Sequence, residues 1–124
     1  MKLPDPPAFD TPDAAARLAA LPDAALDALP YGVVEMERDC KVRRYNATES
    51  RFSGLSPSRV IGRQFFRDVA PCSDNRHVAW RYDEESLDET IDYTFSLRMR
   101  PVPVTLRMLK PASDDPMYLL VRWS

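Results

Sequence analysis

The clearest periodicity in the chain lies in the stretch IDYTFSLRM, residues 91–99. Apolar side chains occupy its odd-numbered positions and polar ones its even-numbered positions. Successive side chains of a β-strand point to opposite faces of a sheet, so a period of two predicts a half-buried strand. The alternation returns over residues 102–108, where Pro101 and Pro103 indicate an irregular or edge beginning.

Residues 117–123 supply a further strand after the turn at Ser113–Pro116. Short connections between consecutive strands predict antiparallel pairing. Upstream, residues 31–37 and 40–45 form a hairpin around Arg38 and Asp39, although the turn lacks the preferred glycine. The C-terminal third and this hairpin together predict a five-stranded antiparallel sheet.

Short helical turns fill the space between the hairpin and the last three strands. Asn46 precedes Glu49 by three residues, which is the spacing of a helix-capping box, and Gly54 ends this helix. Ser56 and Pro57 start a second short helix that ends at Gly62. Residues 73–88 are polar and predict a loop with a short helix near 78–82. Such irregular walls suit the enclosure of a small ligand.

The N-terminal segment predicts a separate helical appendage. Four prolines within the first twelve residues indicate an extended, loosely held arm. Thr11-Pro12-Asp13 begins a helix that runs to about Ala20, and Pro22-Asp23 begins another that ends near Leu29. We therefore predict an α+β fold, with short helices on one face of the sheet. Residues 1–29 form an arm and helical cap, and residues 30–124 form the core.

Composition excludes several classes of function. A chain of 124 residues is one domain, and its net charge of -2 with scattered Lys and Arg argues against a nucleic-acid partner. No apolar run approaches the length of a membrane span and no secretory signal begins the chain, so we expect no membrane partner and a cytoplasmic location. One His and two Cys exclude His-rich metal chemistry and a disulfide scaffold. Arg98, Arg100 and Arg107 are expected on the outer, solubilising face of the sheet.

Three side chains are candidates for chemistry. Tyr45 and Glu49 stand four residues apart, so a phenol and a carboxyl can converge on one point. The pattern alone favours a core Tyr45 and a solvated, helix-capping Glu49. Cys72 is either a small buried hydrophobe, which composition favours, or a reactive thiol or attachment point.

A cysteine-dependent enzyme is disfavoured. His77 lies five residues after Cys72 and is the base for such a dyad, but neither an oxyanion hole nor a substrate clamp is evident. Cys40, inside the hairpin, is interpreted as structural. A Cys40–Cys72 disulfide stays open on the sequence, although a cytoplasmic location argues against it.

Three motifs together resemble one known family. They are YNATE at 45–49, VIGRQFFRDVAPC at 60–72 and DYTF at 92–95 followed by Met99. These segments strongly resemble the photoactive yellow protein family, and the resemblance runs from about Leu29 to Trp123. It implies a PAS domain with an N-terminal helical cap. It also implies a blue-light photoreceptor in sensory signal transduction rather than an enzyme.

The resemblance also implies a chromophore and its binding residues. p-Coumaric (4-hydroxycinnamic) acid would be joined as a thioester to Cys72. Its phenolate would accept hydrogen bonds from Tyr45 and from a protonated Glu49, with Ser53 supporting Tyr45. The further contacts implied are Leu55, Phe65, Val69, Phe95 and Met99. Light would isomerise the double bond from trans to cis, Glu49 would transfer its proton, and the N-terminal helices would detach as the signal.

Two departures from the family pattern affect these expectations. Leu55 stands where the best-known members have an arginine over the phenolic ring, and the segment between Asn75 and Tyr93 is shorter than usual. The alternative function is a pigment-free PAS module for binding or interaction. We expect a monomer or weak dimer that signals to a separate, unidentified protein.

Overall fold

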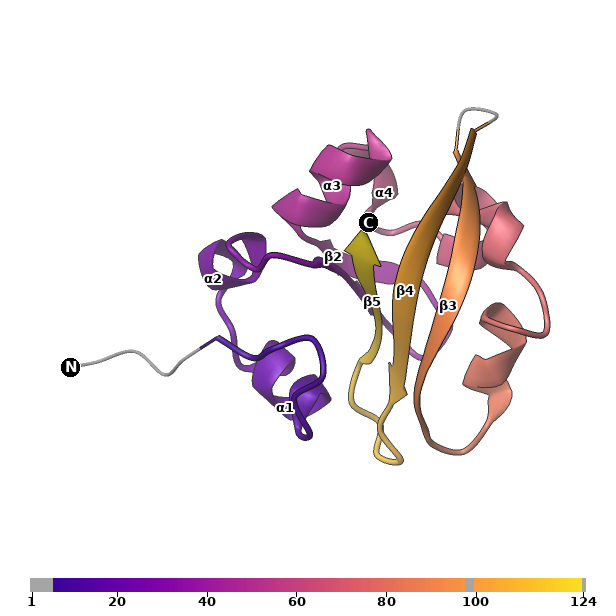
Figure 1. Ribbon diagram of the computed structural model, residues 1–124. Coiled ribbons are helices and arrows are strands. Elements are labelled where there is room, and N and C mark those ends of the chain that lie inside the picture. The colour runs from indigo at the N-terminus through magenta and orange to yellow at the C-terminus, as the bar shows by residue number, and fades with distance from the viewer. Residues whose placement is uncertain (1–5, 98–99, 124) are drawn as a thin grey trace.

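The computed structural model describes residues 6–97 and 100–123, and it confirms the α+β fold with one five-stranded antiparallel sheet (Figure 1). The strand order across the sheet is β2-β1-β5-β4-β3. The strands are β1 (Gly32–Met36), β2 (Val42–Tyr45), β3 (Leu87–Leu97), β4 (Arg100–Lys110) and β5 (Met117–Trp123). Met99 and Arg98 lie outside the described residues, so the expectations for them are not addressed by the structure.

Within the described residues, seven short helical segments surround the sheet. The α-helices are α1 (Ala14–Ala19), α2 (Asp23–Asp27), α3 (Ala47–Ser53) and α4 (Pro57–Val60). A π-helical turn, η1 (Phe65–Val69), and two 3-10 turns, η2 (Pro71–Ser73) and η3 (Ala79–Asp83), complete the set. In Figure 1, α1 and α2 lie to one side of the sheet, and α2 also contacts the N-terminal end of α3 through a hydrogen bond from Ala47 N–H to Asp27 Oδ1. None of the helices within the described ranges is long and apolar enough to cross a membrane.

The long hairpin of β3 and β4 confirms the alternating pattern at residues 91–96, where the odd-numbered side chains are more buried than the even-numbered ones. Its register runs from Leu87 opposite Lys110 to Leu97 opposite Arg100. On its other side, β4 pairs with β5 only from Val104, which lies opposite Trp123. Pro103 therefore needs a partner on one side only, and the prediction of an edge-like beginning for this strand is confirmed.

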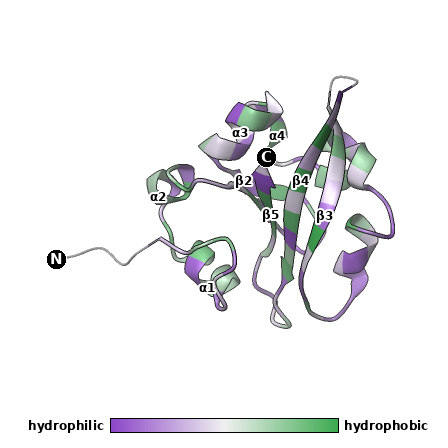
Figure 2. Ribbon diagram, in the orientation of Figure 1, coloured by the Kyte–Doolittle hydropathy of each residue, from purple (hydrophilic) through white to green (hydrophobic). Residues whose placement is uncertain are grey.

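Each face of the sheet carries its own hydrophobic core, and apolar residues recur along β4 and β5 in Figure 2. The helical turns cover one face, where Val34, Met36 and Phe65 are buried. The N-terminal helices cover the other, where Leu18, Leu26 and neighbouring sheet residues are buried. This double cover explains why β1 is buried along its whole length.

The prediction of a loosely held arm is wrong for residues 6–12. Phe9 is 8% exposed, and the Tyr31 hydroxyl donates to the carbonyl oxygen of Pro7 at 2.7 Å. Arg107 donates to the carbonyl oxygens of Phe9 at 2.9 Å and Thr11 at 2.8 Å, and it forms an ion pair with Asp88. The arm thus covers Arg107, which is buried and does not form part of a solubilising surface as predicted.

The predicted caps are borne out at α3 but not at α1. Asn46 Oδ1 accepts from the backbone N–H of Glu49 at 3.0 Å, and Gly54 ends the helix in a left-handed conformation with φ of 79°. The Thr11 hydroxyl oxygen instead accepts from Ala8 N–H, so α1 begins only after Asp13. Proline at the first helical position fixes the start of α4, where Ser56 makes no side-chain cap.

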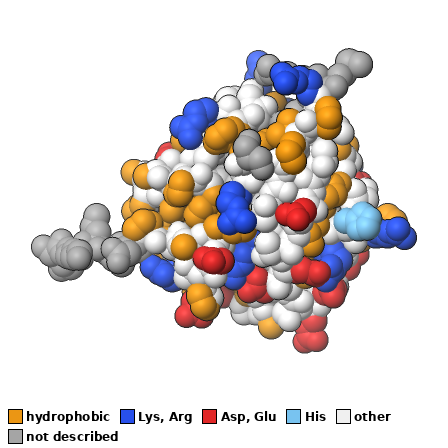
Figure 3. All heavy atoms as spheres, viewed as in Figure 1, with side chains coloured by type: hydrophobic (Ala, Val, Ile, Leu, Met, Phe, Trp, Pro, Cys, Tyr) orange, Lys and Arg blue, Asp and Glu red, His pale blue; other side chains and the backbone are white. Residues whose placement is uncertain are grey.

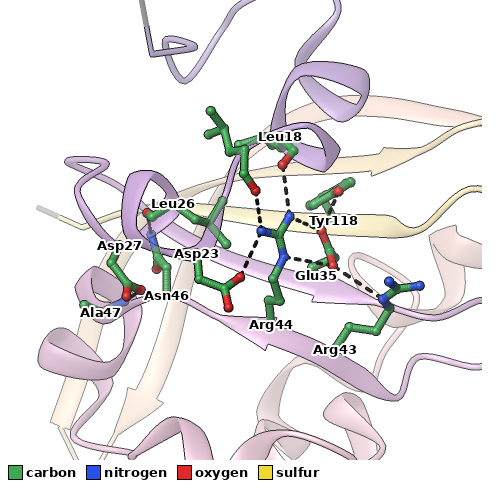
Figure 4. Close-up of polar contacts among 11 residues, drawn as sticks. Leu18, Asp23, Leu26, Asp27, Glu35, Arg43, Arg44, Asn46, Ala47 and Tyr118 are labelled. Carbon is green, nitrogen blue, oxygen red and sulfur yellow. Dashed lines mark hydrogen bonds and ion pairs between the residues drawn. The ribbon is translucent and has the colours of Figure 1, made fainter. Parts of the chain in front are cut away.

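The cap region is fastened to the sheet by polar contacts from β2 (Figure 4). Arg44 donates to the carbonyl oxygens of Leu18 at 3.0 Å and Leu21 at 2.8 Å. The same guanidinium binds Glu35, at 2.6 Å and 3.0 Å for its two closest atom pairs. Asn46 Nδ2 donates to Leu26 O at 2.9 Å. The N-terminal helices are therefore joined to the core by specific hydrogen bonds as well as by apolar packing.

Candidate functional site

A cavity of about 110 Å³ lies between α3, the turns η1 and η2, and the ends of β3 and β5. Every predicted site residue that the structure describes lines it: Tyr45, Glu49, Ser53, Leu55, Phe65, Val69, Cys72 and Phe95. The remaining lining residues are Ala70, Pro71, Ser96 and Trp123. The structure thus brings together residues from Tyr45 to Trp123, which are 78 positions apart in the sequence.

Glu49 is buried, with 3% of its surface exposed, so the interpretation of a solvated capping residue is wrong. Asn46 caps the helix and leaves the Glu49 carboxyl free to turn inward. Burial disfavours the charged form and raises the pKa of Glu49 to about 7, and a hydrogen bond from Trp123 partly offsets this rise. The carboxyl is therefore an acid that can exchange its proton near neutral pH.

Gly32 of β1 provides the space for this carboxyl. A Cβ atom built at Gly32 would lie 1.9 Å from Oε1 of Glu49, which is closer than any real contact. The absence of a side chain on β1 thus allows α3 to place Glu49 against the sheet. This requirement for close approach accounts for one of the three glycines in the chain.

Tyr45 stands at the end of β2 and offers a second hydroxyl to the same end of the cavity. It is 4% exposed, and its hydroxyl donates to Ser53 Oγ at 2.8 Å. Ser53 Oγ also accepts from the backbone N–H of Leu55 at 3.2 Å. Burial and the neighbouring Glu49 raise the pKa of Tyr45, so its phenol stays protonated and able to donate.

Cys72 lies in η2, half-buried and with a free thiol. Its backbone carbonyl oxygen accepts from the Tyr93 hydroxyl at 2.6 Å and from Asn75 Nδ2 at 3.1 Å. Asn75 Nδ2 also donates to the Tyr93 hydroxyl at 2.7 Å. The two side chains hold the turn that carries the thiol, which fixes where Cys72 meets the cavity.

The second cysteine has a different environment. Cys40 lies in the turn before β2 with a φ of 68°, and it does not line the cavity. Burial and the nearby Asp39 and Asp83 raise the pKa of its thiol to about 11. Both cysteines are free, so the Cys40–Cys72 disulfide is not formed. Cys72 is the thiol that faces the pocket.

His77, the base considered for a cysteine-dependent reaction, does not line the cavity that Cys72 lines. His77 is exposed, and its backbone N–H binds Asn75 Oδ1, away from the cavity lining. Among residues 6–97 and 100–123, no group of three or more His, Cys, Asp or Glu is placed to hold a metal. The described lining also has no Lys, Arg or His.

Trp123 is the functional candidate that the sequence analysis missed. Its indole Nε1–H donates to Glu49 Oε1 at 2.8 Å. The ring stacks on Phe52 at 5.6 Å with an interplanar angle of 10°. A signal for it was present, because Met117, Leu119, Val121 and Trp123 alternate along β5 and so share the cavity face.

The site combines a thiol with a buried carboxyl and a buried phenol around one apolar cavity. The Tyr45 O–H donates to Ser53 here, so it would have to turn from Ser53 toward an anionic oxygen placed between Tyr45 and Glu49. That oxygen would then receive two O–H donors in a region of low dielectric, where such bonds are strong. A thiol facing the same cavity can hold a ligand covalently. The residues present therefore fit an acyl ligand that carries an ionisable hydroxyl.

Figure 3 shows how charged side chains are distributed on one face of the molecule. On the face shown, Lys and Arg side chains stand among Asp and Glu side chains and form no single patch.

Comparison with known proteins agrees with this architecture. A family model described as the PAS fold matches residues 20–114. A photoactive yellow protein of Halochromatium salexigens is 33% identical over 118 residues, which cover 92% of this chain and 94% of that protein. A second, from Rhodobacter capsulatus, is 30% identical over 122 residues, with the same coverage.

Solved structures give the same result. The photoactive yellow protein domain of the sensor histidine kinase Ppr from Rhodospirillum centenum superposes with a TM-score of 0.80 at 37% identity, covering 87% of this chain and 98% of that domain. A PAS domain of an HTR-like protein from Haloarcula marismortui reaches a TM-score of 0.65 at 18% identity. The second likeness shows the fold alone.

Proposed function

Because this chain belongs to the photoactive yellow proteins, a PAS family of photoreceptors, we propose that it is a blue-light receptor with p-coumaric acid joined as a thioester to Cys72. One observation carries the proposal. An apolar cavity without any described cationic side chain places a thiol, a buried phenol and a buried carboxyl on one ligand-sized space.

The cavity fits one part of this chromophore directly. An apolar cavity of about 150 Å³ holds a benzene ring in another protein, so about 110 Å³ has the scale of an aromatic ring. The half-buried Leu55 and the exposed Phe52 border the outer side of the site, where side chains can shift to admit the rest of the molecule. Tyr45 and Glu49 match a phenolic oxygen and Cys72 matches an acyl carbon.

Attachment requires an activated acyl donor. The Cys72 sulfur forms a bond to the acyl carbon, and the activating group leaves with the electron pair and receives the proton of the thiol. The reaction is an acyl exchange with no net oxidation. Cys40 does not compete, because its thiol lies outside the cavity and its pKa is raised to about 11.

Tyr45 and Glu49 would hold the phenolate. A buried anion is costly unless donors surround it, and two O–H groups offset that cost. Glu49 donates only while it is neutral, a form that burial favours. When bound, the chromophore would supply absorption of blue light, trans-to-cis isomerisation and an acceptor for a proton.

Glu49 would give up its carboxyl proton after light absorption. The resulting carboxylate would lie 3% exposed in a cavity without a described cation. A buried, unpaired charge costs several kcal/mol, comparable with about 5–15 kcal/mol for the whole stability of a small domain. Charge on α3 can therefore loosen the structure that packs on it.

The N-terminal cap is the region that we propose to respond. Asn46, which caps α3, donates to the carbonyl oxygens of Leu26 and Tyr31, and Thr48 of α3 donates to Leu29 O at 2.5 Å. A shift of α3 therefore acts on the contacts of α2 with the core. Release of α1 and α2 would expose the apolar surface beneath them as the signal.

Leu55 changes how the pigment would be covered. Its side chain is half-buried at the cavity, in the place of the family's arginine, so the cover is apolar and uncharged. Without that cation, Tyr45 and Glu49 are the described donors facing the phenolate. We propose that the stability of the phenolate depends on these two residues more strongly than in relatives that have the arginine.

A separate protein that recognises the released cap would receive the signal. The relative from Rhodospirillum centenum is a domain of a sensor histidine kinase, which makes a kinase one class of output to test. A cytoplasmic location and a monomer or weak dimer stay predictions. Neither affects the chemistry of the cavity.

The test is to incubate the purified chain with activated p-coumaric acid and record the mass and the visible spectrum. We expect a gain of one acyl group and a blue band that bleaches in light and returns in the dark. Cys72→Ala should abolish both signals, and Cys40→Ala is the matched control that should keep them. A folded wild-type chain without the adduct would contradict the proposal and favour a pigment-free PAS module.

A further inference from the structure

Trp123 closes one side of the cavity and is held on three sides. Its indole N–H meets Glu49 Oε1 at 2.8 Å, and its ring lies parallel to Phe52. Phe95 contacts it with the ring centroids 5.7 Å apart. Its backbone pairs with Val104 of β4, so the strand also fixes its position. The donor is therefore preorganised toward the carboxyl.

The chemistry of an indole restricts how the carboxyl can carry its proton. An indole N–H only donates, so Oε1 of Glu49 must accept. A neutral carboxyl has one carbonyl oxygen and one hydroxyl, and with Oε1 accepting, the proton belongs on Oε2. Oε2 receives no hydrogen bond from a described residue, and Glu49 lines the cavity. The hydroxyl is thus the part of the acid left for a ligand.

We propose that Trp123 is a positioning residue that fixes which oxygen of Glu49 carries the proton and stabilises the carboxylate after the proton has left. The inference rests on the proposed function for its biological meaning, because it assigns Trp123 a part in the proton transfer by Glu49. Its physical content, the coupling of Trp123 to the protonation of Glu49, is measurable in the chain without pigment.

The direction of the effect follows from the strength of hydrogen bonds. A bond from N–H to a carboxylate is roughly twice as strong as one to a neutral carbonyl oxygen, so Trp123 favours the charged form of Glu49. Burial acts in the opposite direction. The other titratable groups of the cavity are Tyr45 from β2 and Cys72 from η2, and Arg51 of α3 lies outside it over the Phe52 ring.

The first test compares two tryptophan variants in the pigment-free chain. Infrared difference spectra against pH, with Glu49→Gln as the blank, follow the carboxyl band of Glu49. Trp123→Phe should raise the midpoint by about one pH unit, the size expected when a hydrogen bond to a charged group is lost. Trp80→Phe is the matched control, since Trp80 is 60% exposed on η3. An unchanged midpoint in Trp123→Phe would overturn the inference.

The second test needs no substitution at the site. The chain has two tryptophans, and Trp80→Phe assigns their indole N–H resonances. In the wild-type chain, the Trp123 resonance should move with the midpoint of Glu49 and the Trp80 resonance should stay constant. A Trp123 resonance that ignores this midpoint would overturn the inference even if Trp123→Phe failed to fold.

The two proposals can fail separately. If Trp123→Phe shifts the Glu49 midpoint but the wild-type chain takes up no pigment, the photoreceptor function fails and the positioning role stands. If the wild-type chain is pigmented and light-sensitive but neither the midpoint nor the Trp123 resonance shows coupling, the positioning role fails and the function stands. With both in place, Trp123→Phe should also slow the bleaching step in light.

Discussion

Glu35 and Glu49 are both 3% exposed, but the surroundings of these two carboxyl groups differ. Glu35, on the cap side of the sheet, binds the guanidinium of Arg44 at 2.6 Å and accepts from the Tyr118 hydroxyl at 2.6 Å (Figure 4). Glu49, on the cavity side, has a single described donor, the neutral indole of Trp123. Burial is equal, so the partner decides the chemistry.

The different partners give the two carboxyls different roles: Glu35 stabilises the fold, and Glu49 is suited to proton transfer. An arginine beside a buried carboxylate compensates its charge and fixes its geometry, which suits the fastening of the N-terminal helices. A neutral donor leaves the acid with a pKa raised to about 7 by burial. Proton transfer is thus assigned to Glu49 at the cavity, and the Glu35–Arg44 ion pair holds the N-terminal helices on the opposite face of the sheet.

Removal of the Arg44–Glu35 ion pair should have the largest effect on the free energy of unfolding. Arg44→Met leaves Glu35 buried without its main cation and frees the carbonyl oxygens of Leu18 and Leu21, so unfolding in urea should show a loss of about 3–5 kcal/mol. Arg43→Met is the matched control, because Arg43 approaches Glu35 at 3.4 Å but is 50% exposed, and its loss should cost less than about 1 kcal/mol. Equal losses of unfolding free energy in Arg44→Met and Arg43→Met would contradict the special role given to the buried Arg44–Glu35 ion pair.

The pH dependence of stability tests the other carboxyl. The folded pKa of Glu49 is raised from 4.5 to about 7, so between these values the native state holds a proton that the unfolded chain releases. Its contribution is full below pH 4.5 and is lost as the pH rises through 7, by about 3 kcal/mol at about 1.36 kcal/mol per pKa unit. Urea titrations from pH 4 to 8 should show this decline in wild type relative to Glu49→Gln. Parallel curves for the two proteins would contradict it.

A substitution beneath Glu49 should give the smallest of the three losses. In Gly32→Ala the new Cβ would meet Oε1 at 1.9 Å, so the carboxyl must rotate away from Trp123. Overpacking of this kind costs about 1–3 kcal/mol. In a Glu49→Ala background the cost should fall, because the contacts with Oε1 and Cδ are removed and only the 3.1 Å approach to the Cβ of residue 49 remains. Urea unfolding of the double-mutant cycle measures the coupling. If Gly32→Ala destabilised the Glu49→Ala protein as much as the wild type, the strain would not come from the Glu49 carboxyl.

Local patterns in the sequence predicted much of the fold. The alternation at residues 91–96, the cap at Asn46 and the glycine stop at Gly54 depend on neighbouring residues, and the structure has them where expected. Arg107 could not be placed in this way. Its outward position on β4 follows from the period of two, but its burial depends on an arm about a hundred residues away.

The sequence predicted most of the residues that line the candidate site, but not the environment that sets the protonation of Glu49. The residue pattern raised Tyr45, Glu49 and Cys72 as candidates and the resemblance implied their roles, whereas the local pattern favoured a solvated Glu49. Whether a carboxyl is buried depends on Gly32 and Trp123, which reach it from β1 and β5 and leave no trace in the helix sequence. The long-range contacts that decide protonation are therefore the part that the sequence did not disclose.

We expect Glu49 to give up its proton in light while Glu35 keeps its ion pair with Arg44. Light-minus-dark infrared spectra of the pigment-loaded chain test this directly. We predict loss of a protonated-carboxyl band and gain of a carboxylate band, both absent in Glu49→Gln and both kept in Trp80→Phe. A carboxyl band that persists in Glu49→Gln, or the lack of any carboxyl change in a wild-type chain that bleaches, would contradict the account.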